Sequence, residues 1–131
     1  MTIRNLQRFN DALWDWAILD GCFGNTRIAP TDVDGMVERN GQFLFLEAKG
    51  PSAVIPVGQR ITFEHALNTG IFTVIVVWGR PNEPEAMMVC RLGRMGQKVP
   101  ATLTDLRQAV ADWYRSADKT AIHAQPAIPA R

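Results

Sequence analysis

Apolar residues recur at steps of three and four in three stretches of the chain, which predicts three helices. The first expected helix covers residues 2–18, the second 59–68 and the third 103–118. The third begins after Thr102, with Asp105 three residues further on, a spacing typical of a capping box.

The segment between the first two helices has the pattern of a β-hairpin. Apolar-rich runs at 32–39 and 42–49 flank the dipeptide Asn40-Gly41. Both residues tolerate the positive φ angles of a type I′ turn, so this dipeptide is a strong short-range signal for two antiparallel strands.

The remaining strands follow the second helix. Residues 71–78 form a continuous run rich in β-branched side chains, typical of a strand covered on both faces, and 86–92 form another strand. Residues 93–100 have the composition of a loop. The order α-β-β-α-β-β-α predicts an α/β fold, a mixed sheet flanked by helices, in a single domain over 1–119 with a flexible Ala/Pro tail at 120–131.

The hairpin turn also fixes which side chains face each other. With a two-residue loop, Asp34 lies opposite Glu47 and Asp32 lies opposite Lys49, all four on one face. Opposed residues have Cβ atoms about 4.5–5.5 Å apart. Two carboxylates at that distance either raise the pKa of one of them or attract a hard cation. The alternative is a cross-strand salt-bridged cluster with a purely structural role. Both faces of the hairpin are largely apolar, so we expect it to be buried. Charged side chains are costly to bury, so their presence in this hairpin calls for an explanation.

The string Asp34-x12-Glu47-Ala48-Lys49, between a helix and a helix–strand unit, resembles the PD-(D/E)XK nuclease superfamily. It is similar to the compact members related to Holliday-junction resolvases and VRR-NUC domains. The resemblance covers about residues 3–80 and implies a restriction-endonuclease-like α-β-β-α-β core. Segments 14–16 and 30–35 also resemble small phage proteins, to which no function attaches.

The resemblance implies a metal site and a reaction. Asp34 and Glu47 would be ligands of Mg²⁺ or Mn²⁺, with the backbone carbonyl of Ala48 as a third. Lys49 would position the attacking water or help to deprotonate it. Such a site hydrolyses DNA phosphodiester bonds, because the metal provides an activated hydroxide.

Further residues have weaker claims on this site. Gln59 matches a glutamine that some branches of the family place near the metal, although Phe63 replaces their tyrosine; otherwise Gln59 is a helix-start residue that meets solvent. Asp11 or Asp15 would complete the site from the first helix, or belong to a solvated helix face. Asp32 would pair with Lys49, cap the strand or reach the metal through water.

Basic side chains supply candidate contacts to a phosphate backbone. These are Arg60, Arg91, Arg94 and Lys98. A solvated loop is the alternative for the last three. The four tryptophans lie on apolar stripes and are expected mainly in the core; an exposed ring would be able to stack on a base.

Composition adds limits. Hydrophobic residues make up 47% of the 131 residues, which excludes global disorder, and the net charge of +1 gives no footprint of a nucleic-acid binder. Cys22 and Cys90 lack the spacing of a zinc site and are expected as free thiols in the cytoplasm. No apolar run is long enough to span a bilayer, so no membrane partner is expected.

These observations leave three classes of function open. The first is a divalent-metal-dependent nuclease acting on DNA, for which a homodimer would help to cover a duplex. The second is a catalytically silent nuclease-fold module that binds nucleic acid or a protein partner. The third is a structural or host-modulating phage protein whose charged cluster only stabilises the hairpin.

Overall fold

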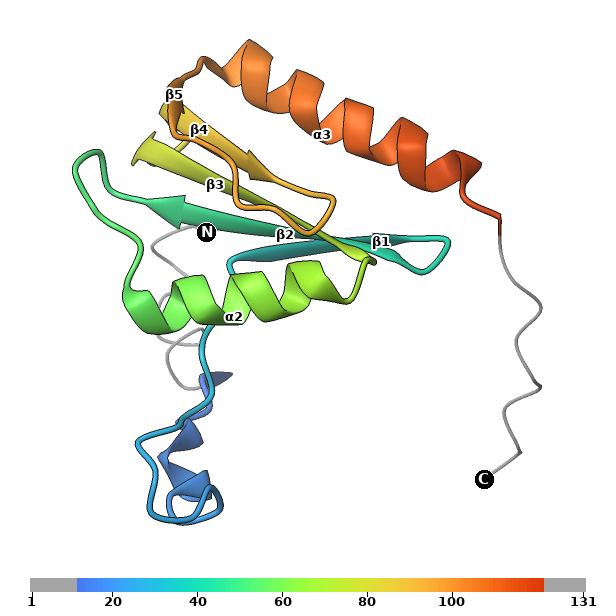
Figure 1. Ribbon diagram of the computed structural model, residues 1–131. Coiled ribbons are helices and arrows are strands. Elements are labelled where there is room, and N and C mark those ends of the chain that lie inside the picture. The colour runs from blue at the N-terminus through green and yellow to red at the C-terminus, as the bar shows by residue number, and fades with distance from the viewer. Residues whose placement is uncertain (1–11, 122–131) are drawn as a thin grey trace. The chain divides into compact units, whose positions relative to one another are not determined.

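The computed structural model describes residues 12–121, and its internal contacts divide the chain after Asp32 into two compact units (Figure 1). Each unit is described by itself. The single domain predicted over 1–119 stays a prediction, and most of the predicted tail, 122–131, lies outside the described residues.

The described part of the first unit, residues 12–32, contains less helix than the sequence predicts. Ala12 is helical, but residues 13–15 are not, and a short 3₁₀ helix, η2 (Trp16–Leu19), follows. The Asp15 carboxylate caps η2 by accepting a hydrogen bond of 2.9 Å from the Ala17 N–H. Aspartate at such a position offers the backbone a local alternative to the helical hydrogen bond, so the helix expected over 2–18 does not reach residue 18.

The second unit is built on a five-stranded mixed sheet. Its strands, in spatial order, are β1 (Gly35–Arg39), β2 (Gln42–Lys49), β3 (Phe72–Arg80), β4 (Glu83–Cys90) and β5 (Val99–Pro100). β2 and β3 run parallel, and every other neighbouring pair is antiparallel. Helix α2 (Val57–Asn68) connects β2 to β3 and lies on one face, while α3 (Leu103–Lys119) lies on the other (Figure 1). The α/β prediction is confirmed, although β5 lies in a segment predicted as a loop.

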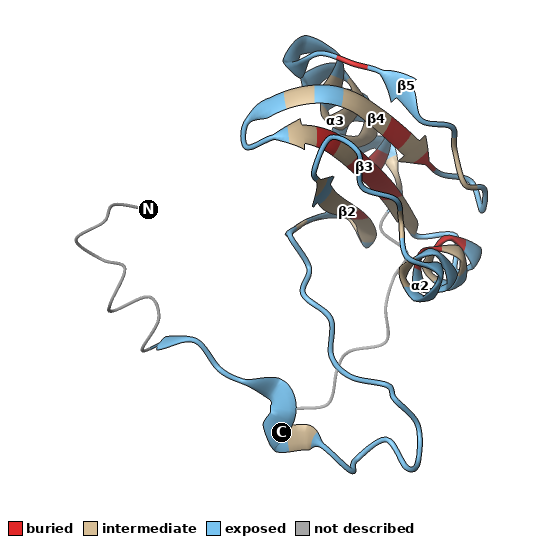
Figure 2. Ribbon diagram, turned by 90° about the vertical axis from the view of Figure 1, so that its left-hand side faces the viewer, coloured by how far each residue is buried: buried red, intermediate tan, exposed pale blue. Residues whose placement is uncertain are grey.

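The two faces of the sheet have separate cores. On the α2 face, a cluster of buried residues joins the helix to β3 and β4: Phe63, Leu67, Val74, Val76, Trp78, Met88 and Cys90. On the α3 face the buried side chains include Leu44, Ile75 and Ala117. Figure 2 shows that buried residues gather on β3 and β4, the centre of the sheet. Each large apolar side chain removed from water contributes about 1.5–3 kcal/mol, so these central strands hold the unit together.

The hairpin turn also anchors the end of α3. Asn40 and Gly41 have φ angles of 51° and 78°, as expected for a type I′ turn. The Asn40 amide donates hydrogen bonds to the carbonyls of Ala117 at 3.3 Å and Asp118 at 3.2 Å, and Arg39 forms a 2.7 Å ion pair with Asp118. Carbonyls that the helix leaves without internal partners are thereby satisfied.

At the other end of α3, the predicted capping box is present. The Thr102 hydroxyl accepts from the Asp105 N–H, and the Asp105 carboxylate accepts from the Thr102 N–H. Within residues 12–121, no helix is long and apolar enough to cross a membrane.

Candidate metal centre and phosphate contacts

The pairing of β1 with β2 has the register that the turn predicts. Gly35 lies opposite Leu46 and Arg39 opposite Gln42. One residue before β1, the Asp34 carboxylate accepts a hydrogen bond of 2.8 Å from the Ala48 N–H. A side chain here takes the position of a main-chain acceptor, which ends the strand pairing and attaches Asp34 to the backbone of β2.

The pairing does not extend to Asp32. The strand predicted over 32–39 begins only at Gly35, and Asp32 falls in the first unit. The pairing of Asp32 with Lys49 therefore stays a prediction. The ion-pair partner of Lys49 is Glu47, two residues earlier on the same strand.

The Ala48 carbonyl lies on the same side of β2 as Asp34. In an extended strand, the N–H and C=O of one residue point toward the same neighbour, and the Ala48 N–H points toward Asp34. Ala48 and Lys49 also line a cavity of about 780 Å³, together with residues of the β3–β4 turn and the start of α3. A backbone oxygen and a carboxylate thus lie on one side of β2.

Glu47 and Lys49 form the half-buried part of the candidate site. Lys49 Nζ lies 3.2 Å from Glu47 Oε1, and the two side chains are 15% and 13% exposed. Phe45, on the same face of β2, packs against the α2-side core, so the pair shares that face. A pair this shielded from water loses less of its attraction to screening than a surface pair.

The hairpin as a whole is not buried, contrary to the prediction. Only Gly35 in β1 is partly buried, and Met36 is 57% exposed. β1 is an edge strand, and α2 packs mainly over β3. Asp34 is exposed for the same reason, so half of the predicted cluster meets solvent and the other half, on β2, is sheltered.

Gln59 belongs to the sheet-facing stripe of α2 rather than to its solvent face. It precedes Phe63 by four residues and Leu67 by eight, and those two side chains are buried in the α2-side core. The Gln59 Oε1 atom is buried and has no hydrogen-bond partner among the described residues. A buried acceptor of this kind calls for an explanation, such as a donor or ion that is absent from the protein chain. The alternative of a solvent-facing Gln59 is therefore wrong.

The donor set was tested against a metal ion. Among residues 12–121, no three His, Cys, Asp or Glu side chains come close enough together to hold one. The available donors are the two carboxylates, Asp34 and Glu47, and the Ala48 carbonyl. Mg²⁺ is usually bound by one or two carboxylates and keeps several waters, so these donors fit Mg²⁺ or Mn²⁺ and do not fit a structural zinc.

The auxiliary carboxylates stay predictions. Asp11 lies outside the described residues. Asp15 caps η2 in the first unit, so its carboxylate already accepts a hydrogen bond there. The exposed rings of Trp14 and Trp16 lie in the same unit, tilted by 36° to each other at a centroid distance of 5.8 Å, contrary to their expected core location.

Two of the predicted phosphate contacts lie in one cavity on the α2 face. Arg60 and Lys98 both line a space of about 350 Å³ beside Trp78. Lys98 Nζ lies 4.4 Å from the centroid of the Trp78 ring. Sequence reasoning missed this contact, because nothing in the local pattern joins two residues twenty positions apart.

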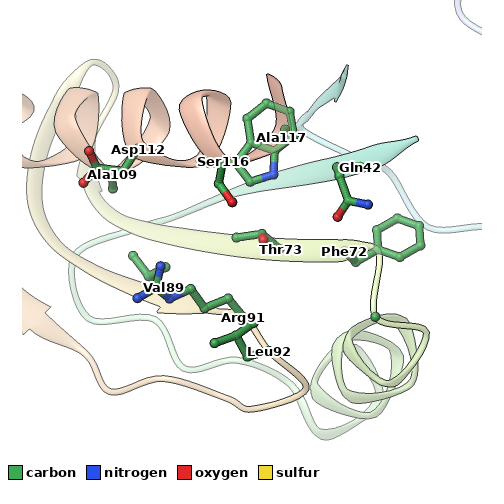
Figure 3. A pocket seen from close by; sticks show the side chains of 12 residues that line it. Gln42, Phe72, Thr73, Val89, Arg91, Leu92, Ala109, Asp112, Ser116 and Ala117 are labelled. Carbon is green, nitrogen blue, oxygen red and sulfur yellow. The ribbon is translucent and has the colours of Figure 1, made fainter. Parts of the chain in front are cut away.

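The other two contacts lie elsewhere. Arg91 and Arg94 close a tight turn through mutual backbone hydrogen bonds of 3.1 and 3.0 Å. Arg91 lines a different cavity, of about 500 Å³, between α3 and the sheet, where Asp112 lies on the helix side (Figure 3). Hydrogen bonds from Gln108 and Arg115 lower the pKa of Asp112, so this cavity carries a carboxylate near its arginine. The candidate contacts thus divide into Arg60 and Lys98, which share one cavity, and Arg91 and Arg94, of which Arg91 shares a cavity with Asp112.

Comparisons with known proteins found no match: no family model, no curated protein and no solved structure matches the chain.

Proposed function

We propose that this chain is a divalent-metal-dependent nuclease that hydrolyses DNA phosphodiester bonds at the Asp34–Glu47–Lys49 site. The observation that supports this most is the 2.8 Å hydrogen bond that attaches Asp34 to Ala48, between Glu47 and Lys49 in the chain. It brings two carboxylates, a carbonyl and an ammonium to the end of one strand. The PD-(D/E)XK resemblance and the restriction-endonuclease-like core belong to the same proposal.

In this proposal each residue has a distinct task. Asp34, Glu47 and the Ala48 carbonyl would hold Mg²⁺ or Mn²⁺, which supplies an activated water and offsets charge on the phosphate when bound. Lys49 neutralises Glu47 before substrate arrives, at 3.2 Å, and then orients the attacking water or a phosphate oxygen with its Nζ protons. Gln59 offers its unpartnered Oε1 as an acceptor to the same water network.

A second candidate function is a silent nuclease-fold module that binds nucleic acid or a protein without turnover. One observation favours it: across residues 12–121 no three acidic, His or Cys side chains gather at one place. A site with only two carboxylates, one of them already paired with Lys49, offers few ligands to a metal that would activate water.

A cleavage screen separates the two. The full chain is incubated with single-stranded, duplex, nicked and branched DNA and with RNA, in Mg²⁺ and in Mn²⁺. Glu47→Gln is the test variant and Glu38→Gln is its matched control, since Glu38 lies on β1 of the same hairpin and accepts a hydrogen bond from Gly41 N–H.

The nuclease proposal predicts cleavage of a DNA substrate that Glu47→Gln lowers by about 100-fold or more, while Glu38→Gln leaves it unchanged. Equal activity of the two variants would place the reaction elsewhere. Binding without cleavage of any substrate would favour the silent module.

A further inference from the structure

We propose that the cavity beside Trp78 is a phosphate-binding subsite for a single strand of nucleic acid that passes the Glu47–Lys49 pair. The inference rests on the proposed function, whose substrate it specifies. The cavity measures about 350 Å³ and is lined by Arg60 and Lys98 over a floor that includes Trp78 and Met88.

The ammonium group of Lys98 lies against an aromatic ring, although the residue as a whole is exposed. It lies over the Trp78 ring, 4.4 Å from the centroid, and a cation over an indole face is attracted by the ring quadrupole. The indole itself is fixed, because it is 3% exposed and its Nε1–H donates to the Ala53 carbonyl at 2.7 Å. Trp78 therefore serves as a support for Lys98 and not as a stacking surface for a base.

The loop that carries Lys98 is also fixed. The Gly96 N–H donates to Cys90 Sγ at 3.3 Å, which joins the loop to β4. A side chain at Gly96 would place its Cβ 2.1 Å from the Val89 carbonyl oxygen, so only glycine permits this approach. A loop held this closely loses little further freedom when a ligand binds.

Arg60 supplies the second cation of the cavity. Its Nε pairs with Glu64 at 3.1 Å, which orients the guanidinium while leaving the terminal nitrogens for a ligand. None of the residues that line this cavity is acidic. The cavity between α3 and the sheet differs, because there Arg91 shares the lining with Asp112. The lining thus presents two cations and no carboxylate, although Glu64 shares Arg60 at its Nε; such a lining favours an anion, and a tetrahedral phosphate can accept from both side chains.

The position of the cavity connects it to the candidate catalytic pair. Trp78 on β3 lies in register with Lys49 on β2, and parallel neighbours are about 4.7–4.9 Å apart. Lys49 and Trp78 share the α2 face, as does Glu47. A phosphate held by Lys98 and Arg60 would thus lie beside β3, the strand next to the one that carries Glu47 and Lys49. A space near the lower limit of small-ligand pockets, about 300 Å³, admits part of one nucleotide and excludes a base pair.

Binding of a labelled single-stranded oligonucleotide to the full chain, measured by fluorescence anisotropy in EDTA, tests the inference without any cleavage. We expect Lys98→Gln and Arg60→Gln each to weaken binding roughly 5- to 10-fold at low salt and to lower the salt slope by about one. The matched controls Arg107→Gln and Lys119→Gln, which remove the same charge from exposed positions on α3, over the other face of the sheet, should change affinity by less than about 2-fold.

Each other outcome has a defined meaning. Equal losses in all four variants, or no binding at all, would overturn the subsite. A mononucleotide or inorganic phosphate that binds as tightly as the oligonucleotide, or a duplex that binds more tightly, would overturn the assignment to a single strand. Loss of binding in the two test variants of a chain that cuts no substrate would support the subsite and reject the nuclease proposal. Cleavage that neither variant changes would support the nuclease proposal and reject the subsite.

Discussion

The two faces of the sheet are packed in different ways, and the candidate chemistry lies on the better packed one. On the α2 face, a continuous buried cluster connects Phe63 and Leu67 to the centre of the sheet. On the α3 face, the helix buries only Ala117 completely, and a cavity of about 500 Å³ remains beneath it. The Glu47–Lys49 pair thus lies in well-packed surroundings, as a binding site requires, whereas Asp112 of α3 is partnered by Gln108 and Arg115 on the exposed surface of the helix.

The largest contrast between the faces should appear in stability. Leu67→Ala on α2 removes a side chain that is 1% exposed and should lower the free energy of unfolding by about 2–5 kcal/mol. Leu106→Ala on α3 removes a partly exposed leucine and should cost less than half as much. Urea unfolding of both variants measures the difference. Equal losses would show that the cavity under α3 closes and that both faces are packed alike.

The next largest effect is expected at Asp34, which lies at the exposed edge of the sheet and is attached to β2 beside the sheltered Glu47–Lys49 pair. Asp34→Asn removes the charge but keeps an oxygen that can accept from the Ala48 N–H, so stability should change by less than about 0.5 kcal/mol. Cleavage should fall by about 100-fold if the carboxylate is a metal ligand. Thermal unfolding and cleavage rates are measured on the same preparation. A variant that keeps full activity would remove Asp34 from the site.

A smaller effect is expected at the start of α3, whose attachment depends on its ends. Thr102→Ala removes the capping box and should cost about 1 kcal/mol of unfolding free energy. Thr104→Ala, two residues later and exposed, is the matched control and should be neutral or slightly stabilising. The denaturant midpoints of the two variants are compared. If Thr102→Ala leaves the unfolding free energy unchanged, packing of α3 against the sheet holds the helix without the cap.

The smallest effect is a pH dependence carried by Cys90. Burial raises the pKa of the Cys90 thiol on the α2 face, whereas Cys22 is exposed. The unfolded chain loses the Cys90 proton at a lower pH than the folded chain, so the unfolding free energy should fall as the pH rises above the ordinary thiol value. At pH 8, iodoacetamide should modify Cys22 at least about 10-fold faster than Cys90, as followed by mass spectrometry. Equal rates would show that the α2 face opens readily.

The sequence predicted the hairpin well, because its determinants are local. The bounds of β2, the positive φ angles of Asn40-Gly41 and the register that follows from them are all confirmed. The capping box of Thr102 is confirmed for the same reason. In each case a few neighbouring residues decide the conformation, so a single sequence contains the information.

The rest depended on contacts that no local pattern specifies. The expected burial of β1 was wrong, because alternation of apolar residues does not reveal that a strand lies at the edge of a sheet. The helix expected over 2–18 does not reach residue 18, because the Asp15 side chain competes with the helical backbone. The contact of Lys98 with Trp78 and the buried Oε1 of Gln59 arise from tertiary packing alone.

The most direct test of the metal centre is isothermal titration of Mn²⁺ into the full chain and into Glu47→Gln, with Glu38→Gln as the matched control. The account predicts one binding site in the unchanged chain and in Glu38→Gln, and an affinity at least about 10-fold weaker in Glu47→Gln. No binding to the unchanged chain, or equal affinity of the two variants, would contradict it.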